Sequence, residues 1–292
     1  MPLELIEDAK GDSRNAQFLA VASDLAYLPE AEGAEAFRTE LGLEARLFSV
    51  GNTQAYVATN DDHIVLAFRG TESPASIEGL KDWLLTDADN LLIQPEGDLG
   101  TDFAAAGVGA RWHEGFMKAL ADIWDPVVEA VEAERKKNDR PIWITGHSLG
   151  GALAVLAAWR CKRKFVPVHQ IYTFGAPMVG NAETAEAIDR ELPDRIFRYV
   201  NDHDPVPHLP TLSLLANKYG HCQKEIGLGI MAEAVAATVT AAEFFKQWAG
   251  KAKEGILQGT LVDDIWRGLQ DRVGAHAMEN YRKKLVEFFK SE

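Results

Sequence analysis

The sequence predicts an α/β fold in which a mostly parallel central sheet is flanked by helices. Short apolar runs of strand length alternate with longer segments of helical periodicity between residues 63 and 200. A chain of 292 residues, 47% of them hydrophobic, can bury the core of one such domain. The sequence has no repeat, low-complexity tract or linker, so we expect a single domain over residues 1–292.

The apolar pattern also predicts the individual elements. Helices are predicted where apolar residues recur at helical spacing: 16–28, 112–137, 149–164 and 277–290. Strands are predicted in a hairpin around Gly51 and Asn52 and in further apolar runs: 46–60, 63–68, 141–145, 170–174, 196–200 and 219–226. The glycine-rich stretch 98–109 is predicted to be a loop. A mostly helical insert is expected at 228–273, before the last helix.

The charge balance limits the class of partner. The chain has 30 basic and 44 acidic residues, which gives a net charge of -14. Such a surface argues against binding of nucleic acid or of an anionic membrane, and it fits a neutral substrate. No uninterrupted apolar run reaches about 18 residues, so we expect no transmembrane segment.

The N-terminus and the cysteines bear on the cellular compartment. Residues 1–15 carry four acidic side chains and lack the basic and apolar regions of a signal peptide. We therefore expect a cytoplasmic protein, or one secreted by a route without a visible signal peptide. The two cysteines, Cys161 and Cys222, give no disulfide framework. We expect both to be buried free thiols.

The motif that points to chemistry is G-x-S-x-G at residues 146–150 (GHSLG). An apolar strand runs directly into it and a helix runs directly out of it. This context is the one that a nucleophile elbow of the α/β-hydrolase type requires. Glycine at the flanking positions lets the neighbouring backbone pack closely, and the turn presents the hydroxyl of Ser148.

A serine nucleophile needs a base and an orienting acid, which follow it in the order Ser, Asp or Glu, His in such folds. Asp202 and Asp204 both follow the predicted strand 196–200, and each qualifies as the acid. Among the later histidines, His276 lies on a loop before the last helix. It is the best candidate for the base by position.

The same fold requires two donors for the oxyanion that forms on the substrate. One is the backbone N–H of the residue after the nucleophile, here Leu149. The other comes from the loop after an earlier strand, where Thr71 follows Phe68-Arg69-Gly70.

Six motifs together resemble the class 3 lipases, the fungal-type triacylglycerol lipase family, and they cover most of the chain. The matching segments are 68–71 (FRGT), 113–116 (HEGF), 146–154 (GHSLGGALA), 174–177 (FGAP), 200–210 (VNDHDPVPHLP) and 276–281 (HAMENY). Neither the signal nor the several disulfides of secreted fungal members is evident in this sequence, which predicts a bacterial-type member.

This resemblance implies a site. It selects Asp204 over Asp202 as the acid, because the family's aspartate directly precedes x-V-P. It also implies Ser148 as nucleophile, His276 as base, and Thr71 with Leu149 as the oxyanion hole. The residues expected to contact the substrate are His113, His147, Trp83, Pro177 and Val206.

Two segments are expected to control access. The family has a lid after the oxyanion loop, and residues 72–90 occupy that place here, with Trp83 on one apolar helical face. An ordinary surface helix is the alternative. The insert 228–273 is interpreted either as a second cap over the acyl site or as a helical pair that extends the core or forms a dimer face.

We therefore predict a serine carboxylic-ester hydrolase, specifically a triacylglycerol lipase that acts through an acyl-enzyme. The expected partner is an acylglycerol or another ester, met in solution or at a lipid–water interface. The chemistry needs no metal and no cofactor. Alternatives are phospholipase A1, a feruloyl-type esterase, an acyltransferase, and a lipase-like protein that only binds partners. The sequence does not indicate an oligomeric state.

Overall fold

The computed structural model describes residues 3–70, 92–201, 204–208, 219–229 and 273–290. Three predicted features lie outside the described residues: Thr71, the candidate lid 72–90 with Trp83, and nearly all of the insert 228–273. The alternative acid Asp202 lies outside them as well.

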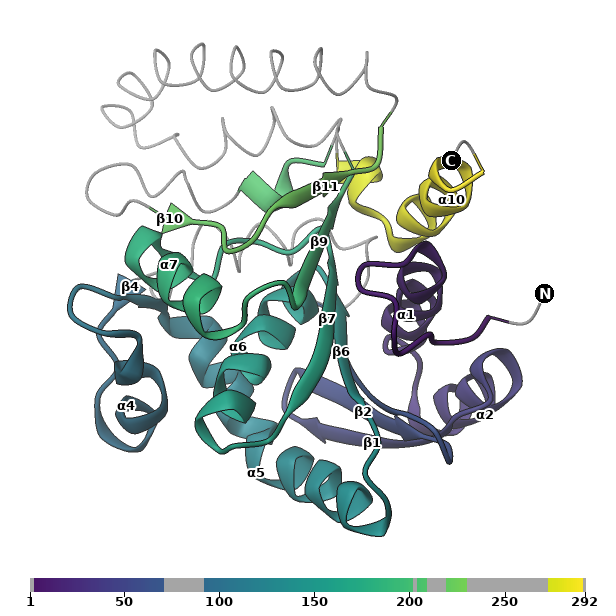
Figure 1. Ribbon diagram of the computed structural model, residues 1–292, viewed down its shortest axis with the longest axis horizontal. Coiled ribbons are helices and arrows are strands. Elements are labelled where there is room, and N and C mark those ends of the chain that lie inside the picture. Colours follow the sequence, from purple (N-terminus) through teal and green to yellow (C-terminus); the bar gives the residue numbers. More distant parts are fainter. Residues whose placement is uncertain (1–2, 71–91, 202–203, 209–218, 230–272, 291–292) are drawn as a thin grey trace.

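A seven-stranded sheet forms the centre of the protein (Figure 1), in the order β1-β2-β3-β6-β7-β9-β11. The five strands from β3 to β11 are parallel, while β2 pairs antiparallel with both β1 and β3. The prediction of a mostly parallel sheet is therefore confirmed. The strands are β1 (Glu44–Val50), β2 (Thr53–Thr59), β3 (Ile64–Phe68), β6 (Ile142–His147), β7 (Val168–Phe174), β9 (Ile196–Val200) and β11 (Glu225–Gly227).

Helices cover both faces of this sheet (Figure 1). One face carries α1 (Ser13–Leu25), α2 (Glu30–Leu41) and α10 (Met278–Phe288), and the other carries α5 (Glu114–Lys137) and α6 (Leu149–Arg163). Two buried clusters result, one under each layer. Such burial of apolar surface on both faces explains why the parallel strands read as nearly continuous hydrophobic runs.

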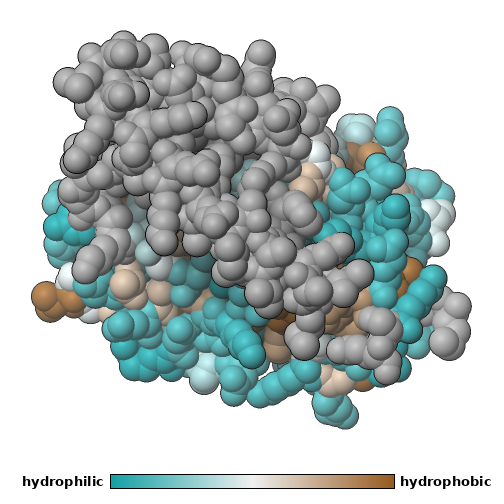
Figure 2. Space-filling model, turned by 90° about the horizontal axis from the view of Figure 1, so that it is seen from above, coloured by the Kyte–Doolittle hydropathy of each residue, from teal (hydrophilic) through white to brown (hydrophobic). Residues whose placement is uncertain are grey.

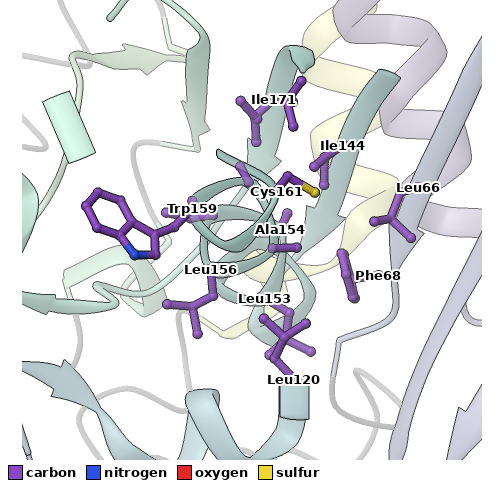
Figure 3. Close-up of a cluster of buried hydrophobic side chains, with 14 of the residues drawn as sticks. Leu66, Phe68, Leu120, Ile144, Leu153, Ala154, Leu156, Trp159, Cys161 and Ile171 are labelled. Atoms are coloured by element: carbon purple, nitrogen blue, oxygen red, sulfur yellow. The ribbon is translucent and has the colours of Figure 1, made fainter. Parts of the chain in front are cut away.

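The helix that leaves the serine turn, α6, is buried over most of its length. Its first residues are alanine, glycine and leucine, which let it pack closely against the sheet. Figure 3 shows its side chains between Leu120 of α5 and strand residues such as Leu66 and Ile144. Cys161 lies in this cluster, and both cysteines are buried and free, as expected. Burial raises the pKa of each thiol to about 12.

The structure contains elements that the apolar pattern does not reveal. The stretch predicted as a loop at 98–109 holds α4 (Gly97–Phe103) and a short 3-10 turn, so that prediction was wrong. The helices α2 and α7 (Ala182–Glu191) were not predicted. The segment 219–226 forms two short strands rather than one. A small four-stranded sheet is also present, with β4 (Leu92–Ile93), β5 (Trp112–His113), β8 (Gly180–Asn181) and β10 (Tyr219–Gly220).

The described surface in Figure 2 is mostly hydrophilic, and its hydrophobic residues stand in small separate groups. Across the described ranges, four large hydrophobic side chains are exposed: Val50, Val108, Phe165 and Val286. No helix within these ranges is both long and apolar enough to cross a membrane.

Candidate active site

Ser148 lies on a strained turn between β6 and α6. Its φ of 57° and ψ of -130° are unusual for a residue other than glycine, and such a conformation costs about 1–3 kcal/mol. The turn is tied to the sheet by a hydrogen bond of 2.9 Å from the Ser148 amide to the Phe174 carbonyl of β7. The α6 helix begins directly after Ser148, so its N-terminus faces the turn.

The glycines on either side of the serine are required by close backbone contacts. A Cβ atom at Gly146 would lie 2.2 Å from the Gly150 carbonyl oxygen. A Cβ atom at Gly150 would lie 2.2 Å from the Phe68 carbonyl oxygen of β3. The two glycines of the G-x-S-x-G pattern are therefore required because the turn packs closely against its own helix and the neighbouring strand.

Asp204 and His276 meet although 72 positions separate them. The imidazole Nδ1 lies 2.7 Å from Oδ2 of Asp204, and both residues are buried. Because an ionised carboxylate can only accept, Nδ1 carries the proton. The Nε2 atom is also buried and has no hydrogen-bond partner among the residues described. This arrangement leaves a lone pair on Nε2 that can take a proton.

Three donors converge on the Asp204 carboxylate. His276 Nδ1 and the Tyr281 hydroxyl, at 2.6 Å, both donate to Oδ2, while the Val206 amide donates to Oδ1 at 2.9 Å. Burial by itself raises the pKa of this carboxyl, but His276, Tyr281 and the Val206 amide outweigh it. The net effect is a pKa below the ordinary value. Asp204 is therefore held as a carboxylate.

Tyr281 and Asn201 join the last helix to the end of β9. The Tyr281 hydroxyl accepts a 3.0 Å hydrogen bond from the backbone N–H of Asn201 while it donates to Asp204. The Asn201 side chain donates to the Ala275 carbonyl at 2.7 Å, one residue before His276. Tyr281 ends one of the six family motifs, but its role is not predicted from the sequence. A buried tyrosine needs a partner for its hydroxyl, and that requirement was the available signal.

Gly175 leaves room for this cluster. Its φ is +61°, and a Cβ atom there would lie 2.8 Å from Asp204 Oδ2, 2.9 Å from the Tyr281 hydroxyl and 3.0 Å from His276 Cε1. The glycine of the FGAP motif thus lets the acid, its tyrosine and the base occupy one pocket beside the end of β7.

His147 lies beside this cluster, with its ring centroid 4.5 Å from that of His276. Both ring nitrogens are engaged: Nδ1 lies 2.9 Å from the Tyr27 hydroxyl and Nε2 lies 2.7 Å from the His276 carbonyl oxygen. Burial and the neighbouring His276 lower the pKa of His147 to about 3, so its ring is neutral.

The remaining predicted site residues occupy different environments. His113 is buried, stacks on Phe116 with centroids 3.7 Å apart, and accepts the Phe116 amide at Nδ1. Pro177 and Val206 are buried, and Leu149 is partly buried at the start of α6. Roles in substrate contact for these residues stay predictions. No cluster of three or more metal-ligating side chains occurs within the described ranges.

Replacing Tyr281 by Phe is expected to lower kcat about tenfold and to reduce the free energy of unfolding by about 1–3 kcal/mol. The change removes one donor from the buried Asp204 carboxylate and leaves the backbone N–H of Asn201 without its acceptor. Ester hydrolysis and chemical denaturation measure the two effects. Tyr172→Phe is the matched control, because its hydroxyl donates to Gln170 instead. Equal losses of kcat in both variants would contradict the assigned contact.

A parallel sheet that ends in a strained serine turn, with a buried His–Asp pair beside it, defines an α/β-hydrolase. The sequence matches the model of the lipase (class 3) family over residues 65–214. The chain belongs to that family, and the resemblance inferred from the motifs is confirmed. Its predicted assignment to a bacterial-type branch stays a prediction.

Relatives and solved structures agree with this assignment. The chain is 32% identical over 168 residues to secreted mono- and diacylglycerol lipase A of Penicillium cyclopium, covering 57% of this chain and 50% of that protein. It is 34% identical over 194 residues to phospholipase A1-Igamma2, chloroplastic, of Arabidopsis thaliana, covering 56% of this chain and 35% of that protein. The matches thus span half or less of these relatives.

Two solved structures show the same fold. A mutant of MDLA from Penicillium cyclopium superimposes with a TM-score of 0.56 at 25% identity, covering 74% of this chain and 77% of that one. The Lip2 lipase from Yarrowia lipolytica gives a TM-score of 0.60 at 21% identity, covering 76% of this chain and 83% of that one.

Proposed function

We propose that this chain is a serine hydrolase that cleaves acylglycerol esters through an acyl-enzyme on Ser148. The observation that carries the proposal is the buried Asp204–His276 hydrogen bond of 2.7 Å, which leaves Nε2 of the imidazole unpaired among the described residues. The residue before the serine, His147, contacts His276, and Ser148 itself lies on a strained turn that precedes a helix. Nucleophile, base and orienting acid are the parts that acyl transfer needs.

In the proposed reaction, Nε2 of His276 takes the proton of the Ser148 hydroxyl as Oγ bonds to the ester carbonyl carbon. The oxyanion accepts hydrogen bonds from the Leu149 backbone N–H and from Thr71. When the tetrahedral intermediate collapses, the carbon–oxygen bond to the alcohol breaks, and the imidazolium gives its proton to that oxygen. Asp204 keeps the ring oriented and stabilises its positive charge.

Water completes the cycle in the same way. His276 removes a proton from water, the hydroxide attacks the acyl carbon, and the intermediate collapses to release the fatty acid. The proton passes through His276 back to Ser148 Oγ. Each step uses the same donors for the oxyanion, so one preorganised site serves acylation and deacylation.

The substrate class rests on the family and on named relatives. Penicillium cyclopium lipase A is named for mono- and diacylglycerols, which are neutral substrates and fit a chain with net charge -14. The second candidate activity is that of phospholipase A1, which the name of the Arabidopsis thaliana relative favours. The two activities share all the chemistry and differ in the group that leaves.

The test combines labelling with a choice of substrate. A serine-reactive phosphonate is expected to label the peptide that contains Ser148, and nitrophenyl esters from short to long acyl chains are expected to be hydrolysed. Dioleoylglycerol and dioleoylphosphatidylcholine, in matched emulsions, then compete for the enzyme. Faster release of fatty acid from the phospholipid would replace the acylglycerol assignment by phospholipase A1. Absence of both labelling and turnover would refute the enzyme and favour a partner-binding protein.

A further inference from the structure

The turn after α1 brings a tyrosine to the catalytic loops. Tyr27 follows the last turn of the helix, where its amide donates to the Asp24 carbonyl at 3.1 Å. The next residue, Leu28, accepts hydrogen bonds from the Gln54 side chain at 3.1 Å and from the Tyr56 hydroxyl at 3.0 Å. The backbone that carries Tyr27 is therefore fixed to the sheet.

The Tyr27 hydroxyl bonds to groups on two different loops. It lies 2.9 Å from Nδ1 of His147, the residue before the nucleophile. The backbone amide of Gly70 hydrogen-bonds the same oxygen. Gly70 ends the FRG segment after β3 and directly precedes Thr71. One hydroxyl thus joins the loop that leads to Thr71 to the serine turn.

The contact is close enough to require glycine at position 70. A Cβ atom there would lie 2.1 Å from the Tyr27 hydroxyl, 2.8 Å from the His147 carbonyl oxygen and 3.2 Å from Ser148 Cβ. The three groups therefore surround a single backbone position. A shift of the Tyr27 ring would therefore displace Gly70 and the serine turn.

The directions of the hydrogen bonds follow from the acceptors. The His276 carbonyl can only accept, so His147 donates to it through Nε2–H at 2.7 Å. A neutral ring with its proton on Nε2 has an unprotonated Nδ1, which accepts from the Tyr27 O–H. Burial raises the pKa of Tyr27, so its hydroxyl keeps the proton that it donates. The chain runs from Gly70 N–H through Tyr27 and His147 to the backbone of His276.

We propose that Tyr27 is a positioning residue for the reaction: its hydroxyl sets the His147 tautomer and fixes Gly70, Ser148 and the backbone of His276 relative to one another. This inference rests on the proposed function. Tyr27 touches no reacting atom and acts through the groups that do. It lies outside residues 65–214, the region that matches the family model. The turn after α1 thus contributes to the proposed active site, while α1 itself packs in the core.

The test is Tyr27→Phe, with Tyr172→Phe as the matched control. Tyr172 is fully buried, and its hydroxyl donates to the Gln170 side chain, away from the Tyr27 contacts. For a soluble short-chain nitrophenyl ester, Tyr27→Phe is expected to lower kcat about tenfold with KM unchanged, because two hydrogen bonds that align the reacting groups are lost. The rate of inactivation by the phosphonate should fall by the same factor. Tyr172→Phe should change neither rate, although its thermal stability falls.

A second measurement does not depend on activity. In protein labelled with 15N-histidine, Nδ1 of His147 should resonate as a hydrogen-bonded acceptor, and Tyr27→Phe should shift it toward the value of an unbonded ring nitrogen. An unchanged kcat in Tyr27→Phe, or an unchanged Nδ1 resonance, would overturn the inference. The proposed function would still hold in that case, because the wild type is active. A wild type that neither turns over nor is labelled would refute the proposed function itself.

Discussion

Replacing Ser148 by Ala is expected to lower kcat for ester hydrolysis by about 10⁶-fold. Removal of the nucleophile of a catalytic triad has an effect of this size, because the base and the acid then have nothing to activate. A residual rate of about 10³–10⁴ over water should remain, supplied by binding and by the oxyanion donors. The remaining rate is measured with a nitrophenyl ester at high enzyme concentration.

The same variant tests whether the loss is chemical or structural. Alanine keeps a Cβ atom at a position with φ of 57°, so the strained turn is the same in both proteins. The melting temperature should therefore stay within a few degrees of the wild type. Pretreatment with the phosphonate removes contaminating wild-type enzyme. Retention of more than about 1% of the wild-type kcat after this treatment would contradict the role of Ser148.

The sheet and the long helices could be predicted because their buried faces give the sequence a regular pattern of apolar residues. Strands such as β3 and β6 are buried on both faces and appear as unbroken apolar runs. The 24-residue α5 has a clear apolar stripe and a basic last turn. In these elements the local pattern and the tertiary packing agree.

Most of the missed elements are short or only weakly amphipathic. In α2, three of twelve residues are buried, one of them a glycine, so no apolar stripe is visible. The strands of the small sheet have two residues each, which is too short for any period. The α7 helix did carry a signal, because the side chain of Asn181 caps its first turn by accepting from Thr184.

The candidate site was predictable in part for a related reason. Ser148, Asp204 and His276 stand in motifs with a fixed order along the chain, so the sequence alone predicts them. The tyrosines are different, because Tyr27 and Tyr281 act through hydroxyl contacts across 120 and 77 positions of the chain. Only the packing of α1 and α10 against the same face of the sheet brings these hydroxyls to the site.

Replacing Asp204 by Asn is expected to lower kcat by about 10⁴-fold, the size of effect known for this change in a Ser-His-Asp triad. The Val206 amide would still donate to the oxygen of the new amide, at the position of Oδ1, while Oδ2, which accepts from His276 and Tyr281, would become the NH₂ group. Its NH₂ group would then face His276 Nδ1 and favour the tautomer with the proton on Nε2. A ring protonated at Nε2 cannot accept the proton of Ser148, so the base is lost without a change of shape.

The matched control is Asp202→Asn, at the other aspartate that the sequence offered as the acid. It should keep nearly all of the wild-type kcat, and a larger loss in Asp202→Asn than in Asp204→Asn would reverse the assignment. The pH dependence of stability gives an independent readout. Because the pKa of Asp204 is lowered on folding, its charge stabilises the folded protein above the unfolded pKa of about 3.9. That contribution is lost as the pH falls through the lower folded value, so any stability that Asp204→Asn loses at neutral pH should shrink below about pH 4.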